Sequence, residues 1–266
     1  MKFVKMHSCG NDYVYFEQGD LKKEDLPALA VKLSDRRKGI GSDGIICLKK
    51  RSGGITMRIF NADGSEGKTC GNGLRCSAFF AKKHMGFSGN KINVFTKSGL
   101  SPVIIEDLGE FTSVATAKMG KPYIFRPSFE MRAALKETEL FLNERDVFAV
   151  NTGNEHVVFF SGLPLSVAVK HIEKTGLFPD GVNIECASVT QNGLKVEVFE
   201  RGSGKTLACG SGAVASAYAA VISGRAKENE FLNVFMPGGT LQVKIINGEA
   251  FLKGETTEVF KGEYEI

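Results

Sequence analysis

The sequence predicts an α+β fold of two similar domains, each a curved antiparallel sheet around a central helix. Two observations support this prediction. A glycine-rich loop with a cysteine precedes a helical run in each half of the chain, at residues 68–84 and 205–222. A second matched pair, residues 10–16 and 153–159, has an offset of 143, close to the 139 between Cys70 and Cys209. Two matched pairs at nearly one offset indicate an internal duplication.

The first half alternates strand-like runs with two helical runs. Residues 25–37 carry apolar side chains at helical spacing, and residues 39–44 form a loop. The Cys70 loop opens a second helix that runs to about His84, where Gly86 ends it. Strands are expected at residues 2–6, 13–17, 45–48, 55–60, 91–96, 103–107 and 112–119.

The second half repeats this plan. Helices are expected over residues 165–174 and after the Cys209 loop, with a short connector at 137–143. Strands are expected at 147–150, 156–160, after a loop at 178–183, and at 196–200, 231–236, 241–246, 250–253 and 258–260. We therefore expect an N-terminal domain at 1–118, which carries Cys70, and a C-terminal domain at 119–266, which carries Cys209.

Composition limits the classes of partner. The chain has 266 residues, 42% hydrophobic content and a net charge of +4. These values are ordinary for a globular protein, and so weak a charge suits anionic small molecules better than nucleic acid. No window approaches the roughly 18 apolar residues of a membrane span, and the first residues lack the apolar core of a signal peptide. We expect a cytoplasmic protein, with neither nucleic acid nor membrane as a partner; a homodimer is left open.

Six cysteines without a Cys-x-x-Cys pair are read as thiols. The four histidines do not have the helical spacing of metal ligands, so no metal site is expected. Cys70 and Cys209 stand apart because each lies at the start of a helix. The helix dipole there stabilises a thiolate, so the pKa of Cys209 should fall from about 8.5 towards roughly 3.5–7.5.

Two thiols placed by a duplication suit stereoinversion. Two halves around an approximate twofold axis would bring Cys70 and Cys209 to face each other across the cleft between domains. One group removes a proton from a carbon and the other returns a proton to the opposite face. Backbone N–H groups at the two helix starts would hold the neighbouring carboxylate and stabilise the developing charge.

At this point the sequence resembles a known family. The two cysteine motifs, residues 70–76 and 207–213, resemble those of diaminopimelate epimerases, cofactor-independent two-cysteine enzymes of lysine and peptidoglycan biosynthesis. Further matching residues occur in order along the whole chain, at 5–7, 10–12, 39–44, 58–66, 153–154, 156, 183–185, 200–204 and 237–239.

The resemblance implies a complete site without a cofactor. Cys70 and Cys209 would be the acid/base pair, and His156 and Glu200 would tune the pKa of the two thiols. The implied substrate-binding residues are Asn11, Gly44, Asn61, Gly71, Asn72, Asn154, Asn183, Glu200, Arg201, Gly210 and Ser211. Arg201 can hold a second carboxylate bidentately, and Glu200 can accept from an ammonium group. The resemblance also implies that the last strand returns to the first domain.

The expected activity is the interconversion of LL- and meso-diaminopimelate, with a small amino acid as the partner. Glu155 departs from the family pattern, which usually has proline there, so a two-cysteine racemase of histidine, lanthionine or glutamate is an alternative. A non-catalytic amino-acid-binding module, a pyridoxal-phosphate racemase using Lys68 or Lys205, and a thiol-redox protein are further alternatives. Nothing in the sequence supports Lys68 or Lys205 as a Schiff-base lysine. A thiol-redox protein normally needs closely spaced cysteines and a thioredoxin-like pattern, and the sequence has neither. The presence of both cysteine motifs argues against a binding module.

Overall fold

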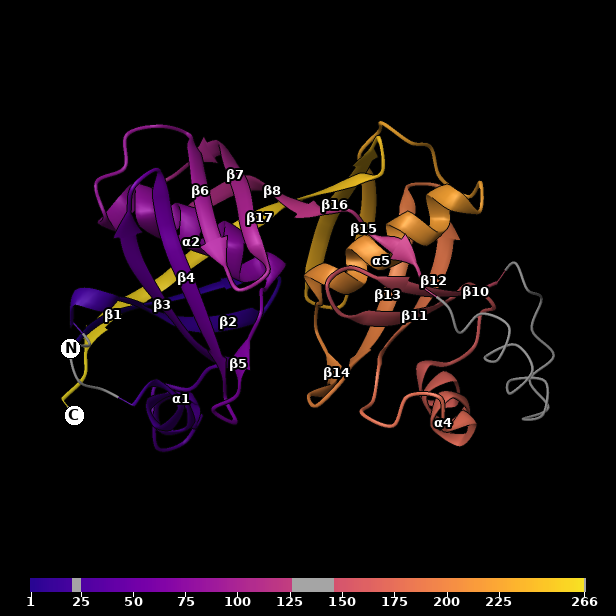
Figure 1. Ribbon diagram of the computed structural model, residues 1–266, viewed down its shortest axis with the longest axis horizontal. Coiled ribbons are helices and arrows are strands. Elements are labelled where there is room, and N and C mark those ends of the chain that lie inside the picture. Colours follow the sequence, from indigo (N-terminus) through magenta and orange to yellow (C-terminus); the bar gives the residue numbers. More distant parts are fainter. Residues whose placement is uncertain (21–24, 126–145, 266) are drawn as a thin grey trace. The chain divides into compact units, whose positions relative to one another are not determined.

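The computed structural model describes residues 1–20, 25–125 and 146–265 (Figure 1). The chain forms two compact units: Met1–Lys118 with Lys253–Ile266, and Met119–Leu252. The last strand, β17 (Glu249–Glu263), thus begins in the second unit and continues in the first. The connector expected at 137–143 lies outside the described residues.

The first unit is a closed ring of strands. β17 pairs with β1 and with β8, and the chain of pairings β1–β2–β3–β4–β6–β7–β8 completes the ring. The pairings β2–β3 and β4–β6 are parallel, whereas the other pairings in the ring for which a register is given are antiparallel. The strands are β1 (Lys2–Ser8), β2 (Asn11–Glu17), β3 (Gly44–Arg51), β4 (Gly54–Asn61), β5 (Glu66–Gly67), β6 (Lys91–Thr96), β7 (Gly99–Leu108) and β8 (Thr112–Gly120).

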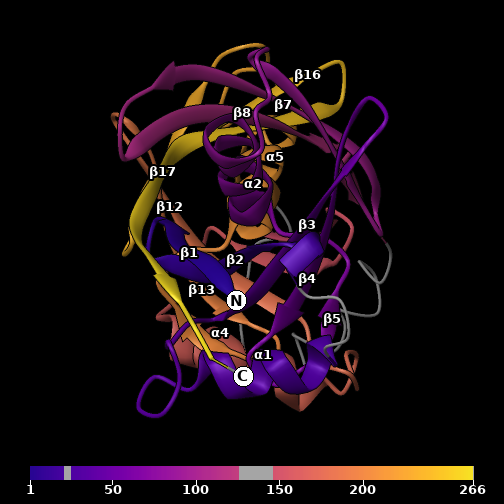
Figure 2. The ribbon, with the colours of Figure 1, turned by 90° about the vertical axis from the view of Figure 1, so that its left-hand side faces the viewer.

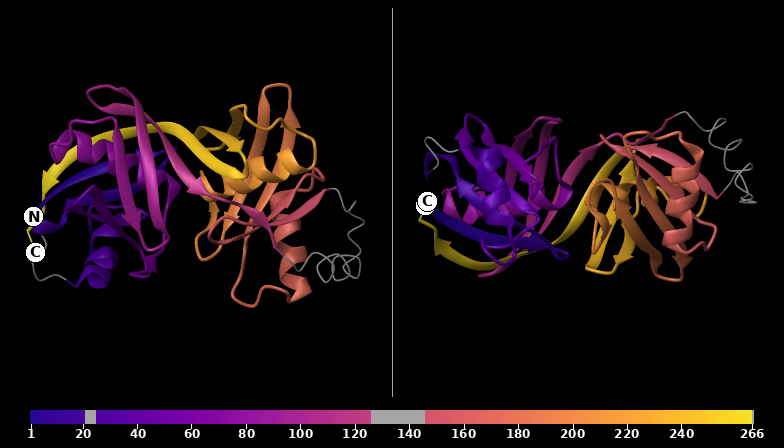
Figure 3. Two further views of the ribbon diagram at one scale, coloured as in Figure 1. Left: turned by 45° about the horizontal axis from the view of Figure 1, so that its top comes forward. Right: turned by 90° about the horizontal axis from the view of Figure 1, so that it is seen from below.

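The ring encloses helix α2 (Gly71–His84). This helix lies inside the ring (Figure 2) and contacts β1, β2, β4, β6 and β7. All its residues from Gly71 to Ala81 are buried. Helix α1 (Leu26–Ser34) lies against β3 and β4, with Asp25 as its N-cap, and the short η1 (Gln18–Asp20) follows β2. Both chain ends lie together in this unit, since the Met1 amino group donates to the Tyr264 carbonyl over 3.0 Å (Figure 3).

The second unit repeats the order of elements. Helix α5 (Gly210–Ile222) contacts β10 to β13, β15 and β16, and α4 (Leu165–Thr175) lies against β12 and β13. The pairings β11–β12 and β13–β15 are parallel, matching the two parallel pairings of the first unit. The strands are β9 (Tyr123–Ile124), β10 (Val147–Asn151), β11 (Glu155–Phe159), β12 (Asn183–Thr190), β13 (Gly193–Glu200), β14 (Gly204–Thr206), β15 (Leu232–Met236) and β16 (Gly239–Ile246).

The matching order and pairings confirm the predicted duplication and α+β class. Three details differ from the expected elements. The short strands β5, β9 and β14 were not expected, and the sheets are mixed because each unit has two parallel pairings. The strands expected at 250–253 and 258–260 are one continuous strand, since residues 254–257 keep extended backbone and Thr256 is fully buried.

One glycine contact is repeated in both units. Gly54 begins β4 with a φ of +158°, and a Cβ there would lie 2.1 Å from the Asn93 carbonyl oxygen. Gly193, at the aligned position of β13, would place a Cβ 2.2 Å from the Asn233 carbonyl oxygen. Backbone oxygens cannot move aside as a flexible side chain can, so both positions require glycine.

Replacing Gly54 by alanine should therefore strongly destabilise the protein. We expect the free energy of unfolding to fall by about 2–6 kcal/mol, from backbone strain and overpacking together. Gly99→Ala is the matched control, because its φ is +110° but a Cβ would meet nothing within 4 Å; it should cost only the strain, about 1–3 kcal/mol. Chemical denaturation measures both, and equal losses would contradict a steric role for Gly54.

Candidate active site

Cys70 occupies the N-cap of helix α2. Its backbone is extended, with φ −147° and ψ 119°, and its Sγ accepts from the Gly73 N–H over 3.3 Å. Gly71 and Asn72 form the first turn, both buried. The predicted helix start is thus confirmed, and the positive end of the α2 dipole lies at the thiol.

Asn11 brings the beginning of β2 to this thiol. The distance from Cys70 Sγ to Asn11 Oδ1 is 3.6 Å, and Asn72 Nδ2 donates to the same oxygen over 3.4 Å. Asn11 Nδ2 donates to Asp43 Oδ2 over 2.9 Å. Three of the expected site residues therefore form one cluster, and Asp43 fixes the orientation of the Asn11 amide.

Gly44 and Asn61 face each other across strands β3 and β4. A Cβ at Gly44 would lie 2.1 Å from the Phe60 carbonyl oxygen, so no side chain fits there. The Asn61 side chain donates to Ser65 Oγ over 3.0 Å. In this structure Asn61 therefore orders the turn that follows β4.

Cys209 occupies the N-cap of helix α5 in the same way as Cys70. Its Sγ accepts from the Gly212 N–H over 3.4 Å and lies 3.3 Å from Ser211 Oγ. Gly210 and Ser211 form the first turn. Cys209 differs from Cys70 in its burial, because it is 5% exposed whereas Cys70 is only partly buried.

A buried polar chain leads to the Cys209 loop. His156 Nδ1 lies 2.7 Å from Glu185 Oε1, and His156 Nε2 lies 3.0 Å from Asn154 Oδ1. The Asn154 amide donates to Ser211 Oγ over 3.5 Å. His156 and Glu185 are both fully buried. This chain links β11, β12, the turn before β11 and the first turn of α5, and it holds the serine beside the thiol.

The ends of β12 and β13 carry the remaining expected residues. Asn183 Nδ2 donates to the Glu155 carbonyl over 2.8 Å, and the Arg201 N–H donates to Asn183 Oδ1 over 3.0 Å. Thr206 Oγ1 donates to Glu200 Oε1 over 2.6 Å. The Arg201 side chain is exposed. Asn183 therefore positions the backbone of Arg201, and the residue as a whole is exposed.

The predicted fall in the pKa of Cys209 is wrong. Burial raises the pKa of the Cys209 thiol well above its ordinary value, and the carboxylates of Glu200 and Glu185 raise it further. The Ser211 and Gly212 contacts lower it by less. Burial also raises the pKa of Glu200, against the hydrogen bonds from Thr206 and Cys209. The protein environment therefore favours the thiol form of Cys209 over the thiolate.

Three contributors were missed from the sequence. Asp43, Glu185 and the fully buried Arg75 each contact an expected site residue. Glu185 and Arg75 both lie within the family-like motifs. A charged residue inside such a motif could have indicated a role in the site. The motifs alone do not identify the contacts of these residues, because partners distant in sequence, such as His156 for Glu185, are brought together only by the fold.

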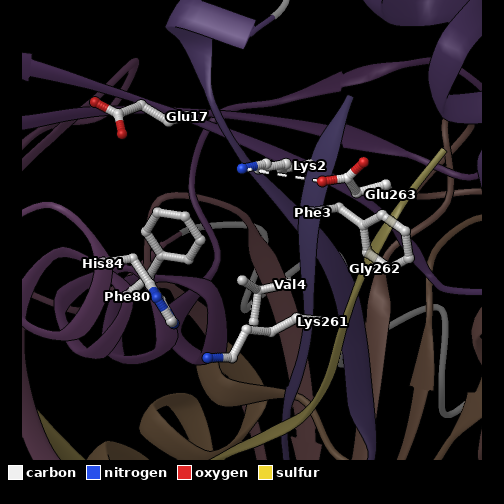
Figure 4. Close-up of a pocket in the computed structure, with 9 residues that line it drawn as sticks. All are labelled: Lys2, Phe3, Val4, Glu17, Phe80, His84, Lys261, Gly262 and Glu263. Carbon is white, nitrogen blue, oxygen red and sulfur yellow. Dashed lines mark ion pairs between the residues drawn. The ribbon is translucent and has the colours of Figure 1, made fainter. Parts of the chain in front are cut away.

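A surface pocket of the first unit lies apart from these residues. It has a volume of about 370 Å³ and contains none of the expected site residues (Figure 4). Strand β1, the end of α2 and strand β17 contribute most of the lining, which includes Phe80 and His84. Lys2 and Glu263 at its rim form an exposed ion pair of 3.9 Å.

Glu200→Gln should make Cys209 easier to deprotonate. Removing a neighbouring negative charge favours the thiolate, so the pH of half-maximal Cys209 alkylation should fall by about 1 unit. Iodoacetamide labelling with peptide mapping measures this. Glu197→Gln, on the same strand but paired with Lys205, is the control and should leave the midpoint unchanged. An unchanged or higher midpoint in Glu200→Gln would contradict the electrostatic role of Glu200.

Two further observations concern membranes and metals. Among the described helices, none combines the length and apolar composition needed to cross a membrane. Within residues 1–20, 25–125 and 146–265, no group of three or more His, Cys, Asp and Glu side chains is arranged to hold a metal ion.

Known proteins resemble this chain in both sequence and fold. Residues 3–125 and 148–259 match the family model described as diaminopimelate epimerase. The diaminopimelate epimerase of Bacillus licheniformis is 40% identical over 284 residues, covering 100% of this chain and 98% of the relative. That of Bacillus subtilis is 37% identical over 280 residues, covering 99% and 98%.

Solved structures share the fold at low identity. A PhzF-family phenazine biosynthesis protein from Bacillus anthracis has a TM-score of 0.72 at 16% identity, covering 100% of this chain and 99% of its own. A hydroxyproline epimerase from Agrobacterium vitis has a TM-score of 0.67 at 12% identity, covering 98% and 90%. These structures show the fold alone, whereas the family model and the full-length relatives show the family. The chain belongs to the diaminopimelate epimerase family.

Proposed function

We propose that this protein interconverts LL- and meso-diaminopimelate by a two-base mechanism that uses Cys70 and Cys209. The observation that carries the proposal is the repeated geometry of the two thiols. Each is the N-cap of the central helix of its unit, and each sulfur accepts the N–H of the third residue of that helix's first turn. The relatives named diaminopimelate epimerase support the choice of substrate.

The reaction needs one base and one acid. The thiolate takes the proton of the substrate α-carbon, and the electron pair of the C–H bond moves toward the α-carboxylate. The other thiol then donates its proton to the opposite face of that carbon, which inverts the centre. Each turnover leaves the two sulfurs with exchanged protonation, so the reverse reaction starts from the complementary state. The mechanism requires both sulfurs to reach opposite faces of one bound carbon.

Backbone groups would stabilise the charge that develops. The N–H groups of Gly71, Asn72, Gly210 and Ser211 belong to the first helical turns, where no intrahelical acceptor is available. A carboxylate bound there is further favoured by the helix dipoles. As negative charge builds on the carboxylate during proton removal, these interactions strengthen and lower the barrier.

The remaining residues would hold the distal end of the substrate. Arg201 offers an exposed guanidinium for a second carboxylate, and Glu200 offers a carboxylate for an ammonium group. Asn11, Asn61, Asn154 and Asn183 supply amide donors and acceptors. A single-carboxylate amino acid would leave part of this set unused, which favours a substrate with two polar ends.

The proposed enzyme needs no cofactor. Lys68 and Lys205 precede the two cysteine loops, and Lys205 pairs with Glu197 over 2.6 Å. A pyridoxal-phosphate enzyme would instead show the visible absorbance of a lysine Schiff base, so a spectrum of the purified protein separates the two classes. The structure pairs none of the six cysteines in a disulfide. Free thiols are usual in reducing compartments, and the cytoplasm is the proposed location.

A stereoisomer-resolved assay tests the proposal. Purified protein is incubated with LL- or meso-diaminopimelate, lanthionine, L-histidine or L-glutamate in deuterated water, and the products are separated by chiral chromatography. Both diaminopimelate isomers should reach one equilibrium mixture with deuterium at the α-carbon. Efficient racemisation of histidine without reaction of diaminopimelate would overturn the substrate. Absence of α-deuterium from every amino acid would point to a binding module.

A further inference from the structure

Arg75 is a buried cation with no role in the proposed reaction. It lies on α2 just past the first turn, and it is among the largest fully buried side chains of the described residues, with an exposed fraction of 0%. Burying a guanidinium removes its hydration and is costly unless a partner compensates. Such a group requires a structural or chemical role.

The contacts of Arg75 all point toward the Cys70 loop or the adjacent hairpin. One terminal nitrogen donates to the Gly71 carbonyl over 3.1 Å, and the other donates to Asn72 Oδ1 and Ser8 Oγ, each over 2.7 Å. Arg75 Nε has no hydrogen-bond partner. No carboxylate of the described part of the chain forms an ion pair with Arg75. No aspartate or glutamate within the described residues therefore neutralises its positive charge.

These contacts continue as a relay to the sulfur. Arg75 occupies Asn72 Oδ1, which leaves Asn72 Nδ2 to donate to Asn11 Oδ1 over 3.4 Å. That same oxygen lies 3.6 Å from Cys70 Sγ. Arg75 thus determines which way the Asn72 amide faces, and through it the position of Asn11 beside the thiol.

The acidic groups that interact most strongly with the Arg75 charge are three thiols and one phenol. They are Cys76, Cys9, Cys70 and Tyr15. Burial raises the pKa of Cys76 to about 12, and burial also raises the pKa of Cys9 and of Tyr15. Those three groups are neutral near pH 7. Cys70, at the start of the helix, is the remaining candidate for a countercharge.

The second half of the duplication has the opposite arrangement. The position aligned with Arg75 is Val214, which is fully buried. The side chain nearest to the Cβ position of Gly73 is that of Ile46, and the one nearest to the aligned Gly212 is that of Glu185. A cation therefore lies behind one thiol, whereas carboxylates lie near the other. The two thiols therefore have the same backbone geometry but opposite neighbouring charges.

We propose that Arg75 is a positioning residue for Cys70: it holds Asn72 and Asn11 around the thiol and supplies the buried positive charge that stabilises the Cys70 thiolate. This proposal rests on the proposed function, in which Cys70 must form a thiolate in each catalytic cycle. Arg75 touches neither the substrate nor the sulfur in this role, and acts through the amide relay and through its charge.

Alkylation of Cys70 as a function of pH tests the proposal. Wild type, Arg75→Met, Arg75→Lys and Arg51→Met are labelled with iodoacetamide between pH 5 and 10, and peptide mapping follows Cys70 and Cys209 separately. In Arg75→Met the pH midpoint for Cys70 should rise by about 1 unit or more, the usual effect of losing a nearby opposite charge. Arg75→Lys keeps the charge and should stay closer to wild type. Arg51→Met removes a charge from an exposed site of the same unit and should change neither midpoint.

The outcome separates an electrostatic role from a purely structural one. An unchanged Cys70 midpoint in Arg75→Met, whatever its melting temperature, would overturn the proposal, as would equal shifts in the Met and Lys variants. If Arg75→Met does not fold, Arg75→Gln, which keeps hydrogen-bond donors, is judged by the same criterion. The labelling does not involve substrate. A wild-type protein that fails to epimerise diaminopimelate would therefore refute the proposed function without altering this result.

Discussion

Replacing either Cys70 or Cys209 by serine should abolish most epimerisation. A serine hydroxyl is a far weaker base than a thiolate, and a positioned acid or base contributes about 10²–10⁴-fold to such a reaction. We therefore expect kcat to fall by at least this factor in each single variant. The change removes only the sulfur, so the helix start and its Gly73 or Gly212 contact can be kept by the hydroxyl.

Deuterium incorporation shows which thiol serves which face. With one base left, each variant should exchange the α-proton of one stereoisomer of diaminopimelate much faster than that of the other, and the two variants should show opposite preferences. Cys186→Ser is the control, because burial raises the pKa of Cys186 to about 12 and no proposed contact involves it. Turnover near wild type in either active-site variant would end the two-base mechanism.

The fold was predictable where the sequence has periodic apolar residues or glycines that mark helix ends and turns. Helix α2 was expected to end near His84 because Gly86 follows, and it ends at His84. The duplication was visible because the cysteine loops and the turns at Gly10 and Gly153 share nearly one offset. Strands β5 and β9, of two residues each, carry no periodicity and exist only through their partners. Two strands were expected at 250–253 and 258–260, whereas pairing with β8 and β1 makes β17 one continuous strand.

The site was predictable in its residue types more than in its electrostatics. The motifs locate both thiols, and the structure brings Asn11 and Asn72 to Cys70, and Ser211 to Cys209. The helix-dipole argument is incorrect for Cys209 because it ignores desolvation and Glu185, which lies under Gly212. Burial and contacts between distant strands decide such a shift, and neither can be read from a local motif.

Arg201→Ala should lower kcat/KM for diaminopimelate. The expected loss of transition-state binding free energy is about 2–5 kcal/mol, the scale for removing one partner of a desolvated charge pair. The guanidinium is exposed in this structure, and the Arg201 N–H, which donates to Asn183 Oδ1, survives the truncation. The melting temperature should therefore stay close to wild type while KM rises. Arg201→Lys should recover only part of the loss, because an ammonium group cannot bind a carboxylate bidentately.

A substrate analogue without the distal carboxylate makes this test specific. L-lysine has the α-carboxylate, the α-ammonium and a distal ammonium but lacks the second carboxylate. Its slow α-deuterium exchange in the wild type should be nearly the same in Arg201→Ala, because the interaction that the variant removes was never made. If the substitution slows exchange of lysine as much as that of diaminopimelate, Arg201 acts on the α-carbon end or on the fold. If it affects neither, the second carboxylate is bound elsewhere.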